Sequence, residues 1–216
     1  MFHKPFSDLL AKTTGETDAC VHLRDHAEFV MWGIHQIGGH THHVLYEFPF
    51  GANYKADFVV VLSHSGGFVV HFIEFEPVGD QIMTKKLEPA ARLKGAMNQI
   101  VDWRDYVEKN QPLIQTDLAR WCETKDRLLW HPPGREAVNY CGNRLRDNDT
   151  FVQFHYHIYI GRRATATGDV RCQINKYQKD GLFIGTWDRF LDAAERIDKR
   201  NADLGKPGFR NRHDGT

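Results

Sequence analysis

Close pairs of cysteines are missing from this sequence. Its four cysteines, at positions 20, 122, 141 and 172, lie far apart in a chain of 216 residues. Zinc ribbons need C-x-x-C pairs and small secreted proteins need a dense set of disulfides, so this spacing argues against both classes. We therefore expect a reducing environment, which favours the cytoplasm.

Long apolar segments are missing as well. No run approaches the ~20 apolar residues that a transmembrane helix needs. Residues 1–18 contain no apolar stretch that resembles a signal peptide. We expect no insertion into a membrane.

A net charge of either sign is also absent, because 28 basic residues balance 28 acidic ones. A nucleic acid would have to be held by a local basic patch rather than by the overall charge. The sequence contains neither a Gly-rich phosphate loop of the Walker type nor a G-x-S-x-G elbow. These absences disfavour ATP hydrolysis and acyl transfer.

The residues that are present predict one α/β domain. A chain of 216 residues with 41% hydrophobic content is long enough to bury one core. We expect this domain to cover residues 1–203. The Gly-rich, polar residues 204–216 are expected to form a flexible tail.

Two periodicities in the apolar residues predict the elements of this domain. Spacings of three and four predict helices over 18–37, 87–110, 113–130 and 186–197. Glycines at 38 and 39 are expected to end the first helix, and Thr186 to cap the last. β-Branched and aromatic residues predict strands at 43–50, 54–62, 68–75 and 151–160, with shorter ones around 170–174 and 182–184.

Turns and loops connect these elements. The turn-forming residues 63–67 join two predicted strands, so residues 54–76 most simply form an antiparallel hairpin that ends at Pro77. Residues 131–150 mix prolines, glycines, asparagines and charges, which is typical of a long loop.

Three carboxylates stand on the predicted hairpin. If Leu62 pairs with Phe68, in a register uncertain by one, Asp57 stands opposite residue 73 or 74. Side chains alternate along a strand, so Glu74 and Glu76 share a face, and Asp57 joins them if it stands opposite Glu74. Carboxylates this close raise one another's pKa unless a cation such as Mg²⁺ or Mn²⁺ is bound. Such an ion activates water and stabilises charge on a phosphate, which suits phosphodiester hydrolysis.

The spacing alone leaves a plainer interpretation open. Asp57 could simply start a strand, with Glu74 and Glu76 facing solvent on a half-exposed hairpin. The pattern D-x(n)-E-x-[E/K] is loose and occurs by chance in many α/β proteins. The surrounding motifs are therefore needed to decide.

Taken in order, these motifs resemble the nuclease domain of Shedu anti-phage proteins, a family of the PD-(D/E)XK or restriction-endonuclease-like superfamily. The motifs are YEFPFGANYKADFVVV (46–61), FIEFEP (72–77), AMNQIVDWRDYVEKN (96–110), YIGRR (159–163) and GTWDRFLDAAER (185–196). The resemblance covers roughly residues 18–197, with 111–150 poorly matched. It implies a restriction-endonuclease-like fold, in which helices flank a central mixed β-sheet.

The resemblance also implies an active site. Asp57 and Glu74 take the places of the superfamily's metal-binding Asp and Glu, and Gln99 that of a helix glutamine near the scissile phosphate. Glu76 departs from the pattern, because the superfamily usually has a lysine there to position water and offset charge. Glu76 is expected to be an extra metal ligand or a base for the water. The missing cation could come from Lys85, Lys86 or Lys94.

Further acidic and basic residues are candidates for the same site. A first-helix acid often completes such sites, and Glu28, Glu16 and Asp25 compete for this role. Glu47 is either one more ligand or a surface residue. Arg162 and Arg163 follow a strand, near the arginines at 144, 146 and 171, and either contact phosphates or pair with the aspartates at 147, 149 or 169.

Aromatic residues and histidines have plainer explanations. Trp103 and Tyr106 share a helix face with Gln99, and Trp103 is expected to pack in the core. The chain has 13 histidines, and two groups of them raise a zinc site as an alternative: 35, 40, 42 and 43, and 155 with 157. His155 and His157 alternate with Tyr159 along a strand, where packing explains them.

The sequence therefore predicts an Mg²⁺- or Mn²⁺-dependent DNA endonuclease of an anti-phage system. By analogy we expect a homo-oligomer, double-stranded DNA as substrate, and a phage-derived trigger or regulatory partner. The main alternative is a catalytically silent module that binds nucleic acid and keeps the nuclease fold, which Glu76 favours. A hydrolase of a small phosphorylated ligand is a third possibility.

Overall fold

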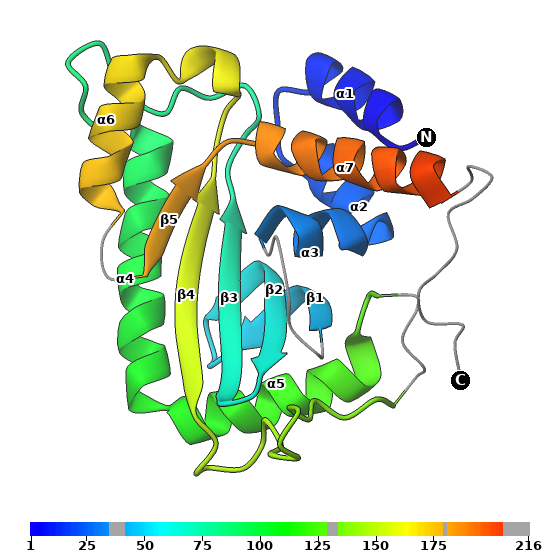
Figure 1. Cartoon of the computed structure of the whole chain (residues 1–216). Coiled ribbons are helices and arrows are strands. Elements are labelled where there is room, and N and C mark those ends of the chain that lie inside the picture. Colours follow the sequence, from blue (N-terminus) through cyan, green and yellow to red (C-terminus); the bar gives the residue numbers. More distant parts are fainter. Residues whose placement is uncertain (35–41, 129–133, 179–180, 205–216) are drawn as a thin grey trace.

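A five-stranded mixed sheet forms the centre of the chain. The computed structural model describes residues 1–34, 42–128, 134–178 and 181–204 (Figure 1). The strands run in the order β1-β2-β3-β4-β5. They are β1 His42–Phe50, β2 Tyr54–His64, β3 Gly67–Phe75, β4 Val152–Tyr159 and β5 Leu182–Gly185. β1, β2 and β3 are antiparallel neighbours, whereas β4 and β5 add in parallel.

Helices cover both faces of this sheet (Figure 1). One face packs against α4, α5 and α6, and the other against α1, α2, α3 and α7. Their bounds are α1 His3–Lys12, α2 Thr17–Asp25, α3 Ala27–Ile34, α4 Ala91–Lys109, α5 Gln111–Lys125, α6 Gly168–Tyr177 and α7 Asp188–Leu204, with a 3₁₀ turn at Arg163–Thr165. The predicted α/β class with a mixed sheet between helices is confirmed, and it is compatible with a restriction-endonuclease-like fold.

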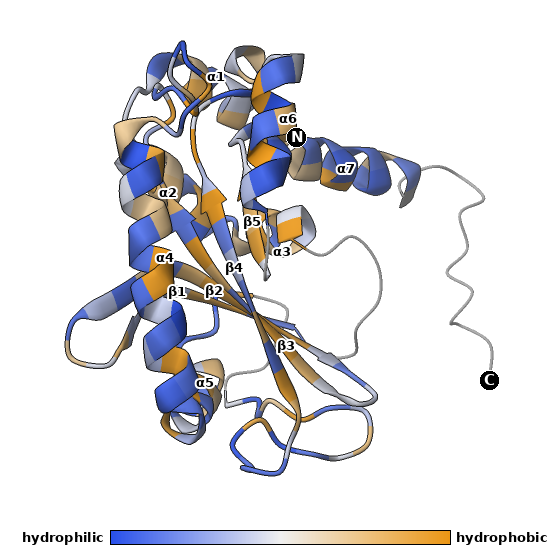
Figure 2. Cartoon of the chain, turned by 90° about the vertical axis from the view of Figure 1, so that its left-hand side faces the viewer, coloured by the Kyte–Doolittle hydropathy of each residue, from blue (hydrophilic) through white to orange (hydrophobic). Residues whose placement is uncertain are grey.

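Each face of the sheet has its own hydrophobic cluster. The α4 core includes Val59, Val61, Val70, Phe72 and Trp103, and the α7 core includes Phe58, Val60, Ile73, Phe75 and Trp187. Figure 2 shows apolar residues along the strands and polar residues on the outer faces of the helices. Trp103 is fully buried against Phe50 and Phe72, so its predicted core role is confirmed.

Two predicted elements differ from the structure. Residues 170–174 were expected to form a strand but lie in α6, because Val170 and Ile174 satisfy helical spacing as well as alternation, and the Thr167 side chain accepts a hydrogen bond from Val170 N. The single helix over 18–37 is two helices, separated at His26, where φ is −131° and ψ is 57°. Residues 35–39, with the glycines expected to end that helix, lie outside the described residues.

The remaining predictions on the elements agree with the structure in kind. The hairpin of β2 and β3 and the short strand at 182–184 are confirmed. Helix α4 begins at Ala91 rather than at 87, since Leu87 has a left-handed φ of 61°. In the described part of the predicted loop, residues 134–150, an isolated bridge joins Val138 to Arg144 without forming a longer element. The tail expected at 204–216 lies, except for its first residue, outside the described residues.

None of the described helices is long and apolar enough to cross a membrane. α4 is the longest of them, with 19 residues, and its outer face is charged and exposed.

Candidate functional site

The register of the hairpin brings Asp57 opposite Glu74. Phe58 pairs with Ile73, so the next position along the antiparallel ladder places Asp57 across from Glu74. Leu62 faces Val69 rather than Phe68, one residue from the expected pairing. Asp57 and Glu74 therefore meet on neighbouring strands, which is the second of the two registers that the sequence allowed.

Asp57 stands where backbone pairing is interrupted. Its Oδ2 accepts a hydrogen bond of 2.8 Å from the backbone N of Phe75, beyond the last paired residues of the hairpin. On the other side, the pairs Tyr46–Phe58 and Phe48–Ala56 flank Glu47, which has a left-handed φ of 51°. A glutamate rarely adopts this conformation. The side chain of Asp57 thus replaces a backbone partner at an irregular point of the sheet.

Strands β1 and β2 change faces at this same point. Ala56 lies in the α4 core and Phe58 in the α7 core, although residues two apart normally share a face. On β1, Phe48 lies in the α4 core whereas Tyr46 packs against the α7 core. Asp57 therefore stands between Ala56, which packs on the α4 side, and Phe58, which packs on the α7 side.

Burial is the main cause of a raised pKa in all three carboxylates. Burial raises the pKa of Asp57 to about 6, and the hydrogen bond from Phe75 N opposes part of that rise. Burial, and then the charge of Asp57, raises the pKa of Glu74 to about 9. Burial raises the pKa of Glu76 to about 7, with Arg92 opposing the rise. Negative charge here is costly unless protons or a cation balance it.

Helix α4 contributes an amide to this cluster. The side chain of Gln99 hydrogen-bonds Glu74, which lowers the pKa of Glu74 in part. This contact puts Gln99 beside the acidic residues, where the resemblance implied it. Tyr106, two turns further along α4, packs on Phe50 and Tyr54 instead.

Glu16 is the additional acid that faces the cluster. Its charge raises the pKa of Asp57, Glu74 and Glu76, and it stands at the N-terminal cap of α2. The two competing candidates are engaged elsewhere. The carboxylate of Glu28 lies 3.7 Å from His26 Nδ1, and the carboxylate of Asp25 accepts a hydrogen bond of 2.9 Å from Arg24 Nε.

Arg92 and Lys55 are the cations that act on the cluster. Arg92 lowers the pKa of Glu76, and Lys55 lowers the pKa of Asp57. Lys55 Nζ also donates a hydrogen bond of 2.7 Å to Glu47. We did not predict Arg92 from the sequence, although it precedes Gln99 by seven residues and so shares its helix face. The roles suggested for Lys85, Lys86 and Lys94 stay predictions.

The donor set fits a small, hard divalent cation held by few protein ligands. Among the described residues, no group of three or more His, Cys, Asp and Glu side chains is arranged to hold a metal. Mg²⁺ commonly uses only one or two carboxylates and takes its other ligands from water and substrate phosphates. Asp57 and Glu74, two half-buried carboxylates on neighbouring strands, meet that requirement, and Glu76 is a further oxygen donor beside them.

Aspartates of α7 hold the two arginines that follow β4. Arg162 donates to Asp188 at 3.0 Å and to the Leu10 carbonyl at 3.1 Å, so it joins the end of β4 to α1 and α7. Arg163 pairs with Asp192. These partners differ from the aspartates expected at 147, 149 or 169. A role for Arg162 and Arg163 in binding nucleic acid stays a prediction.

Residues 14–191 match the family model described as Shedu protein SduA, C-terminal. The match extends over the stretch 111–150, where the resemblance was poor, and it includes the whole acidic cluster. A search of curated proteins finds no match.

Proposed function

The chain belongs to the Shedu SduA C-terminal family, and from that membership we propose that it is a metal-dependent DNA endonuclease. The family suggests a role in anti-phage defence. Beyond that role, we propose that the cluster of Asp57, Glu74 and Glu76 hydrolyses DNA. We also propose that the chain belongs to the PD-(D/E)XK superfamily.

One observation carries the proposal. Asp57 and Glu74 stand side by side, half-buried, on β2 and β3, and the pKa of Glu74 is raised to about 9. A fold gains nothing in stability from two adjacent acids withdrawn from water, and perturbed carboxylates of this kind concentrate at functional sites. A divalent cation explains why both are present.

The residues of the site would divide the work between them. Asp57 and Glu74 would hold the cation, and the backbone N–H of Phe75 orients Asp57. The cation would supply Lewis acidity toward a phosphodiester. Gln99 fixes the carboxylate of Glu74 through its amide. Glu76, with a pKa raised to about 7, can take up a proton near neutral pH.

Nicking of supercoiled plasmid DNA in Mn²⁺ tests the proposal. We expect wild-type protein to nick the plasmid, and Asp57→Asn and Glu74→Gln each to lower the rate by about a hundredfold or more. Glu28→Gln is the matched control, because it also replaces a carboxylate by an amide, but the carboxylate of Glu28 lies beside His26. Undiminished cleavage by both site variants, when they are folded, rejects the assigned site.

A silent module that binds nucleic acid is the second candidate, and Glu76 favours it. A glutamate cannot position an attacking water or offset charge as the usual lysine does. Calorimetric titration with Mn²⁺ separates the candidates. The nuclease requires binding that Asp57→Asn removes, whereas the silent module predicts retained DNA binding without metal binding that depends on these carboxylates.

A further inference from the structure

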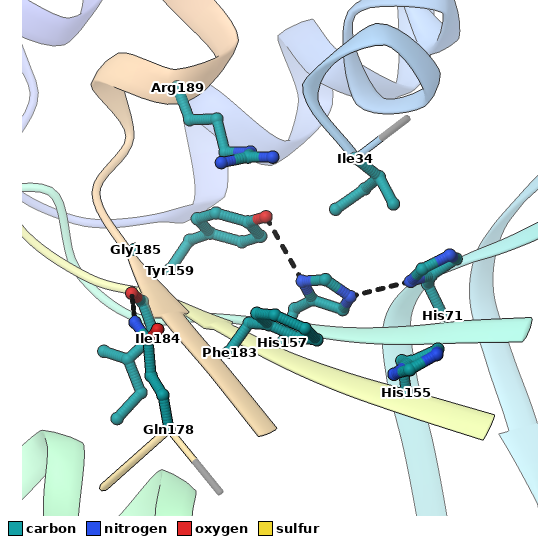
Figure 3. Close-up of a pocket in the computed structure, with 10 residues that line it drawn as sticks. All are labelled: Ile34, His71, His155, His157, Tyr159, Gln178, Phe183, Ile184, Gly185 and Arg189. Carbon is teal, nitrogen blue, oxygen red and sulfur yellow. Dashed lines mark hydrogen bonds between the residues drawn. The ribbon is translucent and has the colours of Figure 1, made fainter. Parts of the chain in front are cut away.

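A pocket of about 230 Å³ lies on the face of the sheet that α3 and α7 partly cover (Figure 3). His71 of β3, His155 and His157 of β4, and Arg189 of α7 line it. His71 and Glu74 stand three residues apart on β3 and therefore point to opposite faces. The pocket and the acidic cluster are separate sites.

The histidines of this pocket form a hydrogen-bonded network. His71 Nδ1 lies 2.8 Å from His157 Nε2, and Tyr159 Oη lies 3.4 Å from His157 Nδ1 (Figure 3). Because these nitrogens point at each other, they do not converge on a common ion, and the described residues hold no metal-binding group of three such side chains. Burial lowers the pKa of His155 and lowers that of His157 further, so both rings are neutral near pH 7.

Positive charge in the pocket comes from Arg189. Its Nε donates to the Gly33 carbonyl, which anchors the guanidinium at the pocket rim. Among the described lining residues there is no aspartate or glutamate to balance it. Its charge reaches the network, since it contributes to lowering the pKa of His157 after burial and His71.

A buried donor or acceptor in the pocket wall is also unsatisfied. Within the described part of the chain, His155 Nδ1 is buried and has no hydrogen-bond partner. Beside it, the rings of His157 and Phe183 stack at 5.0 Å with an interplanar angle of 16°. The described lining of the pocket therefore combines the cation of Arg189, the two neutral imidazoles of His155 and His157, and the aromatic ring of Phe183.

We propose that this pocket binds a small molecule through a phosphate group. The Arg189 guanidinium matches the geometry of phosphate oxygens, and the unsatisfied His155 Nδ1 adds a second polar group beside it. The two nitrogens of His157 are already bonded to His71 and Tyr159, so Arg189 and His155 are the groups that would contact the phosphate. The volume is below the roughly 300–1,000 Å³ of pockets for drug-sized ligands, which favours a compact occupant.

Calorimetric titration of the full chain with inorganic phosphate in EDTA tests this site. EDTA removes divalent cations, and the acidic cluster then repels phosphate, so binding there does not contribute. We expect saturable binding that Arg189→Gln weakens by about tenfold or more. Arg196→Gln is the matched control, because Arg196 is another α7 arginine that donates to an α3 carbonyl, Trp32 O at 2.9 Å, outside this pocket.

Several outcomes decide the proposal. Equal affinity in Arg189→Gln and Arg196→Gln, or no saturable binding by wild type, overturns it. If Arg189→Gln does not fold, His155→Phe is the second variant. It keeps an aromatic ring at this position but removes the imidazole nitrogens, and we expect it to weaken binding. Displacement of phosphate by a 5′-phosphorylated oligonucleotide, in a manner that depends on Arg189, contradicts a small-molecule ligand. Each result is independent of plasmid nicking, and so of the proposed nuclease.

Discussion

Glu74 bears the largest electrostatic cost of the three carboxylates. Its pKa is raised to about 9, first by burial and then by Asp57. A carboxyl with a raised folded pKa stabilises the fold fully below its unfolded pKa, and this stabilisation is lost as pH rises through the folded value. The metal-free protein should therefore lose stability between about pH 4.5 and pH 9.

Glu74→Gln removes this titration. At pH 8 without divalent cations, we expect the variant to exceed wild type in stability by on the order of 1 kcal/mol, a Tm increase of about 2–4 °C for a chain of this size. The difference should shrink at pH 5, because this pH is close to the unfolded pKa of 4.5 and keeping Glu74 protonated in the fold then costs little. Thermal unfolding in EDTA at both pH values measures it. Equal pH dependence in the two proteins would mean that Glu74 ionises without cost.

Glu76 is the residue that separates a nuclease from a silent relative. If it accepts a proton during cleavage, Glu76→Gln should lower kcat by about a hundredfold or more with little change in KM. Steady-state nicking kinetics measure both parameters, with Glu28→Gln, a carboxylate that lies beside His26, as the control. An unchanged kcat would remove Glu76 from the reaction.

The sequence allowed Asp57 to stand opposite Glu74 and the resemblance put Gln99 near them, but the choice of Glu16 among the N-terminal acids was left undecided. Asp57 and Glu74 follow from strand alternation and a one-residue choice of register. Glu16 follows from where α2 begins, and helix starts are poorly determined by sequence when no Ser, Thr, Asn or Asp side chain caps them. Here Glu16 itself occupies the cap position without a side-chain hydrogen bond.

At the scale of elements, the point where residues of β1 and β2 change from one face of the sheet to the other is also the point where Asp57 stands. Glu47 takes a left-handed φ of 51° opposite Asp57. This conformation costs a non-glycine residue roughly 1–2 kcal/mol, and the exposed contact with Lys55 offsets little of it. Strain of this kind persists where the surrounding fold imposes it.

Glu47→Gly relieves this strain. We expect the variant to be about 0.5–1 kcal/mol more stable than wild type, whereas Glu47→Val should be less stable because a β-branched residue resists a positive φ. Urea denaturation of the three proteins measures the difference. If glycine destabilises the fold as much as valine does, the left-handed conformation is not the source of the strain.

Elements whose residues satisfy two periods are the ones the sequence could not assign. Val170, Cys172 and Ile174 alternate as in a strand, yet Val170 and Ile174 are also four apart, and both are buried in α6. The choice comes from outside the segment, since α6 packs against β5. By contrast, the long apolar runs of β2 and β3 had one consistent interpretation.

At the scale of the whole molecule, the sequence predicted the fold class and the arrangement of helices around a sheet better than it predicted the contacts that join separate elements. Helices α4, α5 and α7 and the five strands were foreseen, because their apolar residues form sustained patterns. The break at His26 and the junction of Arg162 with Asp188 were missed, because both depend on contacts between segments far apart in the chain. Assembly into a homo-oligomer and binding of DNA stay predictions.

Anomalous diffraction from crystals soaked in Mn²⁺ tests the central claim most directly. We expect an anomalous peak for a manganese ion bound by the carboxylates of Asp57 and Glu74, and no such peak in Glu74→Gln crystals soaked in the same way. Mn²⁺ bound elsewhere, with no metal at Asp57 and Glu74, would contradict the proposed metal site.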